Sequence, residues 1–122
     1  MTSAEALLNQ AGDVLDGTVH VPTAQRTRSA GHLGRQALEL VVAQACLAHD
    51  ADLPGAPMRT RLIVLDTLAP ADVSRAARSA WEGLSRSYHR HAYELPPTDI
   101  EIRVLLATVR TLLDSHGNRS DG

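Results

Sequence analysis

The chain has 122 residues, the usual size of one domain, and its many Ala and Leu residues and few aromatic ones favour helices over strands. Its formal net charge of −2 excludes binding to nucleic acids through overall positive charge, so such binding would need a local basic patch. The single Cys46 excludes an intrachain disulfide, and the apolar run at residues 38–48 is too short to span a membrane, so we expect a cytoplasmic protein without membrane attachment.

A first helix is predicted for residues 4–16. Residues 2–5 have the spacing of a capping box ahead of it, and Gly17 ends it. Its apolar contacts are Leu7, Leu8, Val14 and Leu15. An extended connector, residues 18–22, follows, and its His20 is expected at the surface rather than as a ligand.

Residues 24–48 are predicted to form a long helix capped by Thr23. Its main apolar stripe repeats at three- and four-residue steps: Ala30, Leu33, Ala37, Leu40, Val41, Gln44 and Ala45. A second apolar side consists of Leu38, Val42 and Cys46. Two apolar sides indicate neighbours on both, either inside a bundle or at a dimer interface. Gly31 and Gly34 each cost about 1 kcal/mol relative to Ala, which indicates close approach of another helix.

Basic residues gather near the start of this helix: Arg26, Arg28, His32 and Arg35. All twelve basic residues of the chain are Arg, whose planar and permanently charged guanidinium groups suit phosphates and carboxylates. Both a solvated face and a phosphate-contacting patch remain open for this cluster.

After a loop at residues 49–56, residues 57–67 favour a short helix, because no other segment could pair with residues 62–65 as a strand. The next helix is predicted to run from Pro70 to His91 or Glu94. Its core stripe is Val73, Ala77, Ala80, Trp81, Leu84, Tyr88 and His91.

Residues 95–97 stop that helix, and residues 98–101 form a second capping box. The last helix, residues 99–115, presents its apolar face at regular spacing: Ile102, Leu105, Leu106, Val109, Leu112 and Leu113. Residues 116–122 are expected to be a disordered polar tail. The predicted fold is therefore all-α, an antiparallel up-and-down bundle of four to five helices in a single domain, residues 1–115.

The end of the fourth predicted helix carries the pattern R-x4-H-x-Y, formed by Arg86, His91 and Tyr93. An imidazole, whose ordinary pKa lies near 6.5, can take a proton from a ribose 2′-OH or give one to the leaving oxygen. The guanidinium of Arg86 can hold the phosphate and stabilise charge on its oxygens, and Tyr93 can donate a hydrogen bond.

Helix geometry argues against one copy of the motif closing a site alone. Five residues apart on a straight helix, Arg86 and His91 point about 140° from each other. Either the helix distorts near Pro96, or two copies supply a composite site. We favour the dimer, because Gly83, one turn before Arg86, would let a partner helix approach.

The spacing of Arg and His is not specific by itself. An Arg and a following His with four to six residues between them occur three times. The pairs are Arg26 and His32, Arg86 and His91, and Arg110 and His116. Tyr93 makes the second pair more specific, because the chain has only two Tyr.

Two other interpretations of this segment stay open. In one, Tyr88 and His91 close the core, and Arg86, His89 and Arg90 are solvated. In the other, His89 and His91 bind a metal, but residues two apart on a helix diverge and no Cys or acidic cluster completes a ligand shell. We therefore expect no metal and no other cofactor.

The segment RSYHRHAYELPPT, which follows a Trp-containing helix and a long helix reading GHLGRQALELVVAQACLA, resembles HEPN domains, closest to an actinobacterial branch. The resemblance covers about residues 23–115. It implies a helical bundle, typically a dimer, with the motif lining the cleft between protomers. By this resemblance Arg86 and His91 would cleave RNA without a metal. Tyr93 would be the residue adenylylated by a nucleotidyltransferase antitoxin, and Ser87 stands where the family often has Asn.

The expected function is a HEPN-type metal-independent ribonuclease, possibly a toxin or defence component, acting as a homodimer. Arg86, His91 and Tyr93 would be catalytic, and the flanking residues would contact phosphate or RNA: Ser87, His89 and Arg90. An alternative is a non-catalytic HEPN-like dimer that binds a nucleotide, RNA or a partner protein. A third is a helical interaction protein in which His and Tyr serve packing.

Overall fold

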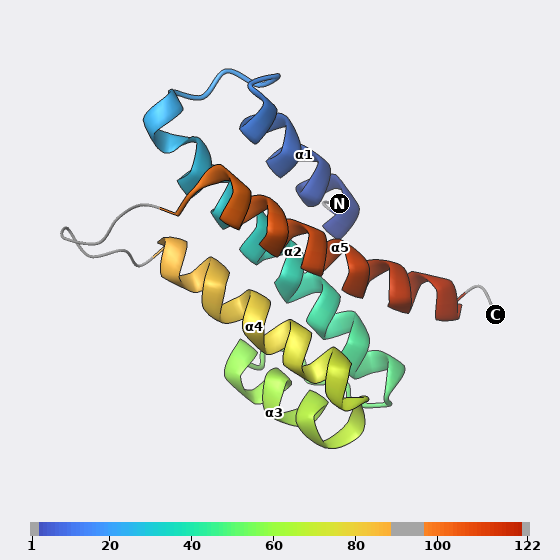
Figure 1. Ribbon diagram of the computed structural model, residues 1–122. Helices are drawn as coiled ribbons and strands as arrows, with labels where there is room; N and C mark the ends of the chain where they lie inside the picture. Colours follow the sequence, from blue (N-terminus) through green and yellow to red (C-terminus); the bar gives the residue numbers. More distant parts are fainter. Residues whose placement is uncertain (1–2, 89–96, 121–122) are drawn as a thin grey trace.

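The computed structural model describes the backbone of residues 3–88 and 97–120 and the side chains of residues 3–86 and 97–115. The described part is all-helical and contains no strand, which confirms the predicted all-α bundle (Figure 1). The elements are α1 (Ala4–Asp16), the 3-10 turn η1 (Thr23–Gln25), α2 (Arg26–Ala48), α3 (Met58–Leu68), α4 (Ala71–Tyr88) and α5 (Asp99–Ser120). Helix α5 thus continues five residues beyond its predicted end, where the sequence predicted a tail.

Helix α2 lies at the centre of the bundle and packs against α1, α3, α4 and α5 (Figure 1). Its two apolar sides are therefore both covered within one chain, which favours the bundle over the dimer interface. The side chains of Ala37, Leu38 and Val42 are at most 1% exposed. The assignment of Leu40 and Gln44 to the buried apolar stripe was wrong: both are exposed, on a side of α2 that none of the described helices covers.

Two glycines lie where neighbouring helices approach closely. A Cβ on Gly34 would lie 2.6 Å from Leu106 Cδ2 of α5, so the predicted close approach at Gly34 is confirmed. A Cβ on Gly83 would lie 2.7 Å from Leu105 Cδ2, also of α5. The prediction that Gly83 makes room for a partner chain is therefore wrong, since α5 of the same chain already covers it.

The helix ends show which capping signals the chain uses. Ser3 caps α1, its Oγ accepting a hydrogen bond of 3.1 Å from the Ala6 amide, so the predicted box at residues 2–5 starts one residue too early. Gly17 ends α1 in the left-handed conformation, at φ 79°, as expected. Thr23 does not cap α2, because α2 begins through η1 without a side-chain cap. Thr98 does cap α5, accepting from the Glu101 amide at 3.1 Å.

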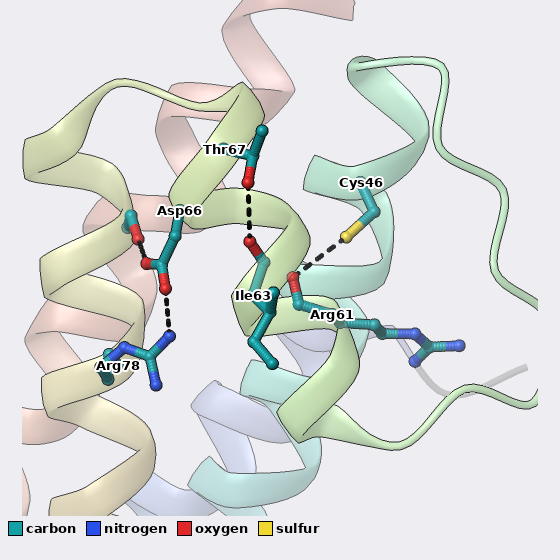
Figure 2. A network of polar contacts seen from close by, with 7 residues as sticks. Cys46, Arg61, Ile63, Asp66, Thr67 and Arg78 are labelled. Atoms are coloured by element: carbon teal, nitrogen blue, oxygen red, sulfur yellow. Dashed lines mark hydrogen bonds and ion pairs between the residues drawn. The ribbon is translucent and has the colours of Figure 1, made fainter.

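A polar network joins α3 to α4 (Figure 2). The carboxylate of Asp66 accepts hydrogen bonds from the Ser74 hydroxyl and from the Arg78 guanidinium. The Ser74 bond, and after it Arg78, hold the pKa of Asp66 below its ordinary value. The thiol of Cys46 donates to the Arg61 carbonyl at 3.7 Å, which joins α2 to α3. None of these pairs was predicted.

Helices α1 and α5 are joined by two arginines of α5. The guanidinium of Arg103 pairs with Asp16 at 2.7 Å and also with Asp99. Arg110 donates to the Asn9 side chain at 2.8 Å. These contacts hold the end of α1 against α5 and leave a shallow groove of about 510 Å³ between the two helices.

Candidate functional site

Arg86 lies in the last turn of α4, and its side chain is exposed. A cation there is favourable in itself, because the last carbonyl groups of a helix carry partial negative charge. The backbone of Ser87 belongs to α4, while its side chain lies outside the described residues. The other predicted site residues also lie outside the described residues: His89, Arg90, His91 and Tyr93. Of the six predicted site side chains, the structure therefore describes the position of one, that of Arg86.

The end of α4 lies at the same end of the bundle as the starts of α2 and α5, because α4 runs antiparallel to both (Figure 1). One contact there ties α2 to α4: the guanidinium carbon of Arg35 lies 4.4 Å from the centre of the Trp81 ring. Trp81 is half-buried and packs against the core, and Leu84 is fully buried, so both predicted core assignments are confirmed. The cation–π contact adds a polar use of Trp81 that the sequence did not predict.

Arg86 points away from this contact. Five residues after Trp81 on a helix, its side chain is turned by about 140° from the direction of Trp81 and α2. It is also on the side opposite buried Leu84. A ligand bound by Arg86 therefore lies on the outer surface of α4 rather than in the interior of one chain.

The arginine cluster of α2 does not act as one patch. Arg26 donates from Nε to the Val21 carbonyl at 3.3 Å, so it fastens the connector. Arg35 covers Trp81. Only Arg28 and His32 are exposed, and a ring nitrogen of His32 lies 3.3 Å from the Gln36 amide nitrogen. The phosphate-patch hypothesis is thereby reduced from four residues to two.

The described residues offer no metal site, since no three His, Cys, Asp or Glu side chains among them come together. Within the same residues, no helix has the length and apolar character needed to cross a membrane. Ser85 Oγ is buried and has no hydrogen-bond partner among the described residues.

Comparison of the chain with family models, with curated proteins and with solved structures found no match. The assignment to the all-α class therefore depends on the structure alone. The resemblance to HEPN domains rests on the residues that follow Arg86 and on the preceding helices, and it stays a prediction. Its single described site residue, Arg86, is exposed at the end of the expected helix.

Proposed function

We propose that the chain is a HEPN-type, metal-independent ribonuclease whose active site forms between two copies of the chain. The observation that supports it is the exposed Arg86 in the last turn of α4, directly before the rest of the R-x4-H-x-Y motif. Because Arg86 faces outward, a second copy can reach it. In this proposal His91 transfers protons, Arg86 holds the phosphate and Tyr93 donates a hydrogen bond.

The reaction is an in-line transesterification. One imidazole takes the proton of the ribose 2′-OH, and the 2′ oxygen forms a bond to phosphorus. The bond from phosphorus to the 5′ oxygen breaks, that oxygen takes a proton from water, and the imidazolium then returns its proton to the solvent. The products are a 2′,3′-cyclic phosphate and a 5′-OH. Arg86 stabilises the negative charge that grows on the phosphate oxygens.

RNA binding in this proposal depends on local charge. The net charge of −2 gives no overall attraction, so Arg86 and Arg90, with His89 and Ser87, contact the phosphates. A toxin of this kind would be silenced by a cognate nucleotidyltransferase antitoxin that adenylylates Tyr93. Mass spectrometry of Tyr93 after coexpression with such an enzyme tests that extension.

A second candidate function is a non-catalytic HEPN-like dimer that binds a nucleotide, RNA or a partner protein. Two observations favour it: the near-neutral net charge, and Ser87 in place of the Asn frequent in the family. This candidate predicts measurable binding to RNA without turnover.

The deciding experiment incubates the purified protein with a fluorescent single-stranded RNA in the presence of a chelator. We expect cleavage to 2′,3′-cyclic phosphate ends that is lost in the double variant Arg86→Ala/His91→Ala. Arg59→Ala is the matched control, because Arg59 is an exposed arginine on α3 and lies outside the R-x4-H-x-Y motif. Equal cleavage by the double variant and the wild type contradicts the ribonuclease. If the wild type and the double variant bind the RNA equally and neither cleaves it, the second candidate is supported.

A further inference from the structure

A pocket of about 580 Å³ lies between α1, the connector and the start of α2. It is distinct from the surface that carries Arg86. Its lining residues are Gln10, Val14, Val19, Val21, Gln25, Arg28, Ser29, His32 and Leu33. The volume is in the range of small-molecule sites, roughly 300–1000 Å³.

The pocket has an aliphatic side. Val14 is 3% exposed, Val21 and Leu33 are half-buried, and Val19 is 42% exposed although it is a large apolar residue in a connector. The described residues that line it include no Phe, Tyr or Trp, so a flat base would have only the His32 imidazole and the Arg28 guanidinium to stack on. An alkyl chain suits this surface better, because burial in contact with Val and Leu removes it from water.

The pocket also has one permanent cation, Arg28, on its rim, with His32 beside it. Arg28 and His32 lie four residues apart on α2, and therefore on the same face. None of the described lining residues is acidic, and the nearby Asp13 lines the groove between α1 and α5 instead. The charge of the rim is thus complementary to an anion.

Hydrogen bonds hold the connector wall of the pocket in place. The amides of Thr18 and Val19 both donate to the Asp13 carbonyl, at 3.0 and 3.4 Å. Arg26 Nε donates to the Val21 carbonyl at 3.3 Å. Because these bonds fix Val19 and Val21 before any ligand arrives, little ordering is needed on binding.

We propose that this pocket binds a small organic anion with an aliphatic chain and a carboxylate or phosphate head. The chain lies against Val14, Val19 and Val21, and Arg28 holds the head, with His32 beside it. This inference goes beyond the proposed ribonuclease and does not depend on it, because neither Arg28 nor the pocket is part of that site.

The test titrates the full chain with octanoate, octyl phosphate, octanol and inorganic phosphate by calorimetry, with NMR of valine methyl groups to locate the ligand. We expect octanoate, octyl phosphate or both to bind one per chain and to shift Val19 and Val21. Whichever of octanoate and octyl phosphate binds more tightly identifies the preferred head group. Octanol, which lacks the charge, and inorganic phosphate, which lacks the chain, should bind at least about tenfold more weakly.

Two variants separate the contributions of head and chain. Arg28→Gln should weaken the charged alkyl ligands about tenfold and leave octanol unchanged. Val19→Ser, in the connector, should weaken all three alkyl ligands. Arg59→Gln is the control and should bind like the wild type. The proposal is overturned if neither charged alkyl ligand binds, if Arg28→Gln binds them as tightly as the wild type, or if the shifted methyl groups lie elsewhere.

Discussion

Two of the three arginines of helix α4 are used in different ways. Arg78, in its first half, pairs with Asp66 of α3, within the network that also contains Ser74 (Figure 2). Arg86, in its last turn, is exposed and makes no ion pair with any described residue. The first arginine stabilises the fold, and the second is available to a ligand. The difference shows that an arginine in this chain has to be judged by its partners and not by its position on a helix.

The largest expected effect separates these two arginines. Arg86→Ala should lower RNA cleavage about 100-fold, because it removes the group that stabilises charge on the phosphate. It should lower the thermal midpoint only slightly, since Arg86 has no described partner to lose and gives up only its interaction with the last carbonyl groups of α4. Arg78→Ala should do the reverse, lowering the midpoint and leaving cleavage by the folded protein intact. Cleavage assays and thermal melts of both variants measure this. The comparison fails if both variants lose activity or if both lose stability to the same extent.

Two glycines give a second contrast, in stability alone. Gly34→Ala places a Cβ 2.6 Å from Leu106 Cδ2 and 3.3 Å from Leu84 Cδ2. Overpacking should exceed the gain in helix propensity and lower the free energy of unfolding by about 1–2 kcal/mol. Gly12→Ala meets no atom within 4 Å and should raise it by about 0.5–1 kcal/mol. Urea unfolding measures both, and a stabilising Gly34→Ala would show that α2 and α5 are not in close contact.

The Arg35–Trp81 contact predicts a smaller effect. Arg35→Met keeps most of the side-chain length and removes the charge over the ring. The free energy of unfolding should fall by roughly 0.5–1 kcal/mol. Trp81 is the only Trp, so its fluorescence follows unfolding and also reports directly on the loss of the cation. An emission spectrum identical to that of the wild type would mean that Arg35 does not cover Trp81 in solution.

The pH dependence of stability tests the α3–α4 network. The pKa of Asp66 is lower in the folded chain than its ordinary value of 3.8, chiefly because of the Ser74 hydrogen bond. Ionised Asp66 therefore stabilises the fold above that value, and the contribution is lost as the pH falls through the folded pKa. Unfolding measured from pH 6 down to pH 2 should show a shallower acid loss for Asp66→Asn than for the wild type. Asp52→Asn, in the loop before α3, is the control. Identical pH profiles for Asp66→Asn and the wild type would contradict the network.

Much of the fold follows from local patterns in the sequence. The bounds of α1 were predicted at both ends, because the apolar spacing stops at Gly17, which adopts the left-handed conformation. The Thr98 cap and the buried face of α5 were predicted for similar reasons. The exposure of Leu40 was not, because periodicity does not tell which side of a central helix its neighbours leave open.

Contacts between distant residues could not be predicted. Gly83 indicates close approach, but nothing local says whether the approaching helix belongs to the same chain. Nor does the local sequence predict the cation–π contact between Arg35 and Trp81 or the ion pair between Arg78 and Asp66, because each joins two different helices. In the candidate site the residue types suggest the chemistry, while their convergence would depend, under the proposed function, on how two copies meet.

Complementation between two inactive variants tests the composite site most directly. Arg86→Ala and His91→Ala are purified separately, each is shown to be folded and dimeric, and the two are mixed in equal amounts and allowed to exchange subunits. If Arg86 of one copy acts with His91 of the other, half of the dimers are mixed and each holds one intact site, so cleavage should recover to about a quarter of the wild-type rate. No recovery after demonstrated exchange would contradict a site shared between two copies.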